Sequence, residues 1–339
     1  MPALDALSSA LQGELACEPD WMELLKAANV ALVTPNLRHT LLHADATIPE
    51  DVATFLTLID KRNNERNANL RSMAFDAIVA LNAAGIEPVL LKGMAVWATC
   101  APHAQHYARM MSDVDLLLGS SDEDAALHTL LNAGFKIYRR DPEGAPHIIA
   151  ELWRDGGVGM LDLHRRLPGP PAFAAQFDCH AHTTQVSWGG LARLPTTTLQ
   201  IYLTCVHDML HDDGFWSGGF DVRHLCDIAA LTKTTSSVDW SLFGRLIRSR
   251  MSRNALHSQL VAAQRIAGAE IPKTIRQSYV ARLHYLRLRV QYAQPGLHLP
   301  LVVLGLALEA FNLDRGNAAT RYSARLRRIL QIRHHPNRI

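Results

Sequence analysis

The feature that most constrains this chain is a pair of aspartates, Asp113 and Asp115, at the start of an apolar run that ends at Leu118. If the run is a β-strand, both carboxylates project from one face, because side chains alternate along a strand with a period of two. A second apolar run, Pro88–Leu91, enters a turn at Lys92-Gly93. Two carboxylates behind such a turn suit a divalent cation that carries phosphate oxygens.

An Asp-x-Asp pair alone is weak evidence for a metal site, since strand ends and turns are rich in aspartate. The segment Leu161-Asp162-Leu163-His164 supplies a third aspartate on a predicted strand. Three converging aspartates would repel one another, and a divalent cation removes that penalty. Ligation by carboxylates alone favours Mg²⁺ or Mn²⁺ over zinc. His164 shares a face with Asp162, where it would orient that residue or an acceptor, or would be a hydrogen-bonded core histidine.

At these residues the chain resembles the nucleotidyltransferase superfamily of the DNA polymerase beta type. More narrowly, it resembles proteins with LLKG, R…DxDLL and LDLHxRL in that order, over roughly Ile59 to Leu231. The resemblance implies that Asp113, Asp115 and Asp162 bind two metal ions as the catalytic carboxylates. It also implies transfer of a nucleoside monophosphate from an NTP such as ATP to an acceptor, with release of pyrophosphate.

The same resemblance implies a nucleotide-binding set made of Lys92, Gly93, Arg109 and Ser112. Each has an alternative: Lys92 as a surface lysine at a strand end, Arg109 as a brace for the carboxylates, and Ser112 as a cap of the turn. Many relatives have a second small residue in the turn, whereas this chain has Met94. With Gly93 as the single small residue for close approach to phosphate, nucleotide binding is less strongly predicted than metal binding.

The acceptor is not specified by the sequence and would be a small molecule, a peptide, a protein or an RNA end. One alternative is a catalytically degenerate relative that binds a nucleotide or a partner, which Met94 favours. Another is a metal-dependent hydrolase centred on His207 and His211, whose spacing of four on a helix can chelate zinc. Asp208 rather than glutamate follows His207, so the protease-type His-Glu-x-x-His motif is absent.

The predicted fold class is α+β, with a small mixed sheet and helices packed on one side. We expect an N-terminal helical region (1–85), a nucleotidyltransferase core (86–170) and a C-terminal helical domain (171–339). The first region contains a long amphipathic helix that ends near Gly85, and its polar middle reads as a solvated face or as a contact for nucleotide or acceptor. A hairpin is predicted around Asp155-Gly156-Gly157. The stretch after residue 171 reads as irregular.

Composition indicates an ordinary globular protein, with 48% hydrophobic and 19% charged residues. The net charge of +2 is too small to imply nucleic-acid binding, but seven arginines and no acids follow residue 314, so RNA is a possible partner of this tail. We expect a cytoplasmic protein without a membrane span, in which the apolar window Leu297–Leu313 is a buried helix. The five cysteines predict buried thiols rather than disulfides: Cys17, Cys100, Cys179, Cys205 and Cys226.

Overall fold

The computed structural model describes residues 2–16, 19–44, 46–101, 108–119, 121–143, 145–167, 169, 179–234, 238–247 and 249–310. The chain divides into two compact units. The sheet unit comprises Thr47–Thr204 and Ala230–Gly244, and the helical unit comprises Met1–Ala46, Cys205–Ala229 and the chain from Arg245 onward. The domain boundaries expected at residues 85 and 170 concern independent folding and stay a prediction.

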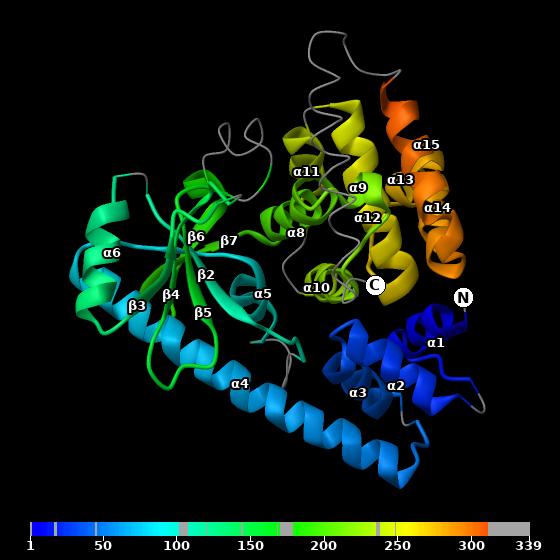
Figure 1. Ribbon diagram of the computed structural model, residues 1–339, viewed down its shortest axis with the longest axis horizontal. Coiled ribbons are helices and arrows are strands. Elements are labelled where there is room, and N and C mark those ends of the chain that lie inside the picture. The colour runs from blue at the N-terminus through cyan, green and yellow to red at the C-terminus, as the bar shows by residue number, and fades with distance from the viewer. Residues whose placement is uncertain are drawn as a thin grey trace. The chain divides into compact units, whose positions relative to one another are not determined.

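The sheet unit is built around a mixed sheet of seven strands in the order β3-β4-β5-β2-β1-β7-β6 (Figure 1). Two of the pairings are parallel, β2 with β5 and β1 with β7, and the others are antiparallel. The strands are β1 (Val89–Leu90), β2 (Asp113–Leu117), β3 (Lys136–Arg140), β4 (Ile148–Trp153), β5 (Met160–His164), β6 (Thr183–Ser187) and β7 (Leu191–Pro195).

Helices flank these strands in the sheet unit (Figure 1). They are α4 (Glu50–Ala83), α5 (Lys92–Cys100), α6 (Glu123–Asn132), the 3-10 turn η2 (Cys179–His182), α8 (Thr197–Val206) and α11 (Trp240–Leu246), the last two continuing into the helical unit. The α+β class predicted from the sequence is therefore confirmed. The predicted hairpin is also present, as the antiparallel pair β4 and β5.

Helix α4 is one unbroken helix of 34 residues, about 50 Å long at 1.5 Å per residue. It begins after Pro49 with Glu50 and Asp51 in the first turn, where acids suit the positive end of the helix dipole. Gly85 adopts a φ of 76° just beyond its end, a left-handed conformation that glycine adopts without strain. The buried stripe of α4 packs on one face of the sheet, against alternate residues such as Val114 and Leu161.

Because strand side chains alternate, the opposite face of β2 and β5 carries the other residues. The first face forms the core with α4 and α6 and is apolar. The second face carries the aspartates of both strands, and near it Val89, Leu91, Leu117 and Leu167 form a small apolar cluster. The sheet therefore presents its acidic residues on the side opposite α4.

The helical unit contains no strand among its described residues. Its elements are α1 (Pro2–Leu11), α2 (Trp21–Val30), α3 (Thr34–His43), the π-helical turn η3 (His207–His211), α9 (Gly214–Ser217), α10 (Val222–Thr232), α12 (Arg250–Ala267), α13 (Lys273–Arg276), α14 (Tyr279–Ala293), the 3-10 turn η4 (Pro295–Leu297) and α15 (His298–Ala310). The last turn of α10, from Ala230, belongs to the sheet unit. Helix α12 has a capping box made by Ser249 and Ser252, and it packs against α1 and α14.

Three expectations have clear outcomes in the fold. The stretch read as irregular contains the hairpin β6–β7, which extends the sheet past residue 170. The apolar window near the C-terminus is not a buried helix in its described part, since Val303 and Leu304 of α15 are about half exposed. Buried thiols are confirmed at Cys100, Cys205 and Cys226. Among the described residues, no helix combines the length and apolarity needed to cross a bilayer.

Candidate active site on the sheet

The parallel pairing of β2 and β5 brings the two acidic strand segments into register. Asp115 lies directly opposite Asp162, and Asp113 lies opposite Met160. All of these side chains stand on the sheet face opposite α4, because they alternate with the core residues Val114 and Leu161. The aspartates predicted from the sequence to converge therefore come from adjacent strands and share one face.

Asp115 is the buried centre of this group, with 2% of its surface exposed. Its Oδ1 accepts from Nζ of Lys92 at 2.7 Å and lies 2.8 Å from Nε2 of His164. Burial alone would raise the pKa of Asp115, but the Lys92 charge and the His164 hydrogen bond outweigh it and hold the pKa well below its usual range. Asp115 is thus an ionised carboxylate at neutral pH.

Lys92 lies at the point where β1 turns into α5, and its φ of 45° is unusual for a residue other than glycine. Burial would lower its pKa, but the carboxylates of Asp115 and Asp113 outweigh this effect and raise the pKa. Lys92 is therefore a charged partner of Asp115 rather than a surface lysine.

The pKa of Asp162 is shifted in the opposite direction from that of Asp115. Burial raises its pKa to about 8, and the neighbouring charges of Asp115 and Asp113 add to the effect. On its other side, Asp162 pairs across the sheet with Glu151 of β4, whose carboxylate forms a two-point ion pair with Arg139 at 2.6 and 2.8 Å. Asp115, Asp162 and Glu151 therefore form a row of carboxylates across three strands. Lys92 pairs with Asp115 at one end of the row, and Arg139 pairs with Glu151 at the other.

This row fits a divalent cation, on the evidence of its own charges. Ligand atoms of Asp115, Asp162 and His164 lie within 4.8 Å of one another, and Asp113 is near enough to raise the pKa of Asp162. The pKa of Asp162 is raised first by burial and then by the neighbouring carboxylates, and a bound cation would oppose both effects. Because His164 already contacts Asp115, the donors left for an ion are mainly carboxylate oxygens, which suit Mg²⁺ or Mn²⁺.

His164 contacts Asp115 and not the neighbouring Asp162 that the sequence suggested it would orient. It is fully buried, which rules out direct contact with an acceptor in this conformation. Burial lowers its pKa in spite of the hydrogen bond to Asp115. His164 therefore positions Asp115 as a neutral imidazole.

Gly93 and Arg109 contact each other closely. Arg109 is 5% exposed, and a Cβ added to Gly93 would collide with its guanidinium. The backbone carbonyl of Arg109 accepts from the amides of Asn63 and Asn67 of α4. Gly93 thus provides room for the Arg109 side chain, and the close approach to phosphate that the sequence suggested stays a prediction.

Two further residues of the predicted nucleotide-binding region have defined positions. Met94, which departs from the pattern of many relatives, is 1% exposed and packs in the core, so its side chain does not occupy the acidic face. Ser112 donates from Oγ to Asp113 at 3.0 Å. Ser112 therefore contacts one of the predicted metal ligands rather than capping the turn with its side chain.

The polar middle of α4 has a role that the sequence did not suggest. Asn63 and Asn67 are buried, and Arg66 donates from Nε to the carbonyl of Met111 at 2.9 Å. These side chains fix the chain between Arg109 and Met111, just before β2 begins. Most of the segment 61–69 is exposed, so the expectation of a solvated face is confirmed there but missed these contacts. The expected contact for nucleotide or acceptor stays a prediction.

The histidines predicted as an alternative metal site belong to the helical unit. His207 and His211 begin and end the π-helical turn η3, with ring centroids 5.4 Å apart. They therefore belong to a different unit from the sheet aspartates. The arginine-rich tail predicted to bind RNA lies outside the described residues.

Comparison with known protein families identifies the family of this chain. A family model described as uncharacterised nucleotidyltransferase matches residues 18–268 of the 339-residue chain. No curated protein matches the chain. The matched region includes the whole seven-stranded sheet and each of the aspartates on its acidic face. The chain therefore belongs to this nucleotidyltransferase family, and its general function is nucleotidyl transfer.

Proposed function

We propose that this chain transfers a nucleoside monophosphate from an NTP to an acceptor, depends on Mg²⁺ or Mn²⁺, and releases pyrophosphate. The observation that carries the proposal is the register of β2 and β5, which opposes Asp115 to Asp162 and keeps Asp113 on the same face. Membership of the nucleotidyltransferase family supports the reaction class.

In this proposal Asp113, Asp115 and Asp162 hold two divalent ions. Bound divalent ions would neutralise the charge that develops on the attacking acceptor oxygen and on the oxygen of the leaving pyrophosphate. Lys92 and His164 hold Asp115 in its ionised form and in one orientation. Ser112 fixes Asp113 from the side. The residues that surround the carboxylates thus keep the ligand set arranged before substrate arrives.

Asp162 is the carboxylate that we assign to the acceptor side. It would orient the acceptor hydroxyl and receive its proton, while the hydroxyl oxygen forms a bond to the α-phosphorus and the bond from that phosphorus to pyrophosphate breaks. The nucleotide phosphates would meet the turn formed by Lys92 and Gly93, where backbone amides at the start of α5 favour anions. Arg109, packed against Gly93, would stabilise this turn from behind.

The acceptor remains one of four classes: a small molecule, a peptide, a protein or an RNA end. The alternative of a degenerate relative that binds without catalysis was favoured by Met94. Since that side chain lies in the core, it gives no support to the alternative. The three acidic residues on one sheet face favour catalysis over binding alone.

The test is transfer of label from each α-labelled NTP in the presence of Mg²⁺, with pyrophosphate release measured in parallel. Acceptor pools of the four classes are assayed separately. The test variants are Asp113→Asn and Asp162→Asn, and the matched control is Asp155→Asn, an exposed aspartate of the β4–β5 turn that pairs with Lys136.

We expect Mg²⁺-dependent transfer that falls on the order of 10²–10³-fold in each test variant, the range seen when one group that stabilises transition-state charge is removed. The control should retain the activity of the unchanged protein. Transfer that survives both test variants would reject the site. NTP binding without pyrophosphate release in any pool would favour the binding relative.

A further inference from the structure

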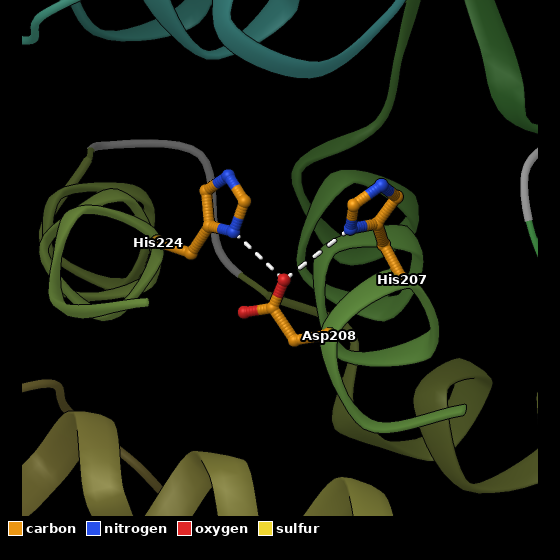
Figure 2. Close-up of side chains that lie close together, drawn as sticks. All are labelled: His207, Asp208 and His224. Carbon is orange, nitrogen blue, oxygen red and sulfur yellow. Dashed lines mark hydrogen bonds and ion pairs between the residues drawn. The ribbon is translucent and has the colours of Figure 1, made fainter. Parts of the chain in front are cut away.

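A second cluster of possible metal ligands lies in the helical unit. Figure 2 shows His207 and Asp208 of η3 beside His224 of α10, with both imidazoles directed at the same carboxylate oxygen. Nδ1 of His224 lies 2.8 Å from Oδ1 of Asp208, and Nδ1 of His207 lies 3.4 Å from it. Three potential ligand atoms, two nitrogens and one oxygen, therefore converge on one point.

Further oxygen donors surround this point. Oδ2 of Asp212 lies 3.6 Å from Nδ1 of His207, and Oδ2 of Asp221 lies 3.9 Å from Nδ1 of His224. Asp208 itself is 5% exposed, whereas the side chains of His207 and His224 are 22% and 14% exposed. The cluster is thus buried at Asp208 and partly exposed at the imidazoles.

The neutral side chain of Gln259 contacts the oxygen of Asp208 that the imidazoles do not contact. Nε2 of the fully buried Gln259, on α12, donates to Oδ2 of Asp208. This bond leaves Oδ1 directed at the two imidazoles, as Figure 2 shows. A hydrogen bond to the distal oxygen of a carboxylate is the usual support for a metal ligand, because it fixes the orientation of the ligating oxygen.

The geometry also agrees with a coordinated ion. In a tetrahedral zinc site with ligand bonds of about 2.0–2.1 Å, neighbouring ligand atoms lie about 3.3 Å apart. The separation of His207 Nδ1 from Asp208 Oδ1 matches that spacing, and it is long for an N–H···O hydrogen bond. The His224 separation would have to widen by about 0.5 Å to match it.

We propose that His207, Asp208 and His224 bind one divalent ion of the zinc class, with Asp212 and Asp221 as the nearest additional oxygen donors. Two imidazole nitrogens with one carboxylate suit Zn²⁺ and its borderline neighbours, not Mg²⁺. The π-helical turn supports the proposal, since such turns occur often at functional sites. This site lies within the helical unit and is independent of the nucleotidyl-transfer site on the sheet.

The experiment measures zinc in the full chain, both as isolated and after removal of metal and titration with Zn²⁺ against a competing chelator. An Asp162→Asn background limits binding by the sheet carboxylates. The variants are His207→Gln and His224→Gln, with His257→Gln as the control, a histidine of α12 in the same unit that is no part of the cluster. Co²⁺ is used in parallel, because its visible absorption differs between tetrahedral nitrogen-containing sites and octahedral oxygen sites.

We expect one zinc per chain, at least a tenfold loss of affinity in either cluster variant, and no change in the His257→Gln control. The unchanged protein should also show a tetrahedral Co²⁺ spectrum and a higher Tm with Zn²⁺. The last two measurements do not depend on the variants folding. Absence of zinc and of a Tm shift in the unchanged protein, or affinity that both cluster variants retain, would show a hydrogen-bonded cluster only and overturn the proposal.

Discussion

Asp115 in the sheet unit and Asp208 in the helical unit are both buried aspartates. Their direct contacts are similar, but the groups around those contacts differ. Each is ionised and held by two nearby donors on one oxygen, Lys92 and His164 for Asp115, and His224 and His207 for Asp208. Burial would raise the pKa of Asp208 too, but the two histidines outweigh it and lower the pKa. The first contacts of the two carboxylates are therefore equivalent.

The difference lies in the next neighbours. Around Asp115 the additional groups are carboxylates, with Asp162 opposite it and Glu151 beyond. Around Asp208 they are the amide of Gln259, the carboxylate of Asp212 near His207, and Asp221, which is itself paired with Arg223 at 2.9 Å. The sheet site therefore has excess negative charge that a hard cation and its phosphates would use, whereas the helical cluster has nitrogen donors for a softer ion.

The largest expected effect comes from removing the cation beside Asp115. Lys92→Met would leave a buried carboxylate with His164 as its remaining partner, and breaking a buried pair from one side costs about 3–5 kcal/mol of unfolding free energy. Urea unfolding measures the loss. A loss below about 1 kcal/mol, the value typical of an exposed pair, would show that Lys92 and Asp115 do not form a buried ion pair.

Lys136→Met is the matched control for this prediction. Lys136 also pairs with an aspartate at 2.7 Å, but its side chain is 51% exposed and that of Asp155 is 73% exposed. The same chemical change should therefore cost about 0–1 kcal/mol there. A similar cost at Lys92 and Lys136 would mean that Asp115 is not the desolvated ion described above.

The second prediction is that replacing an aspartate by asparagine changes the free energy of unfolding in opposite directions in the two clusters. In protein without divalent metal, Asp162→Asn should stabilise the fold by about 2–3 kcal/mol near pH 8, less than the full pKa shift implies because solvent screens the charges. Since the folded pKa of about 8 exceeds the ordinary value, the folded state holds a proton that the unfolded state has lost. The stability of the unchanged protein should therefore fall between about pH 4 and pH 8.

Asp221→Asn should destabilise the helical unit over the same pH range. Burial would raise the pKa of Asp221, but His224 and Arg223 outweigh it and lower the pKa, so its charge contributes stability that is lost as pH falls through the folded pKa. Thermal unfolding of both variants at pH 5 and pH 8 gives the comparison. Stabilisation by both substitutions, or by neither, would remove the distinction between the clusters.

Local patterns in the sequence were sufficient for much of the fold and for the acidic strands. The alternation in β2 and β5 predicts which side chains share a face, because the period of two is a property of each strand alone. The opposition of Asp115 and Asp162 depends on the register between strands that are distant in sequence. No local pattern specifies that register, so only the family resemblance indicated that the aspartates converge.

The missed features have physical reasons of the same kind. The hairpin β6–β7 has few apolar residues, although Gly189-Gly190 is a turn signal that could have indicated it. Glu151 joins the acidic row through cross-strand pairing with Asp162. Asn63 and Asn67 continue the buried stripe of α4 at helical spacing, but polar residues on such a stripe are recognised only when their partner, the Arg109 carbonyl, is known.

The smallest expected effect concerns the support of Asp208 by Gln259. Gln259→Leu keeps the volume roughly constant and removes one neutral donor to a buried charge, a loss of about 1.5–2 kcal/mol. His207 and His224 still contact the other oxygen, so the loss should stay well below that of Lys92→Met. Urea unfolding of Gln259→Leu and Gln259→Glu tests this order, since the Glu variant adds a second carboxylate beside Asp208 and imitates the sheet site. If Gln259→Glu were as stable as the unchanged protein, the amide would contribute nothing specific, and the two buried aspartates would differ less than their surroundings indicate.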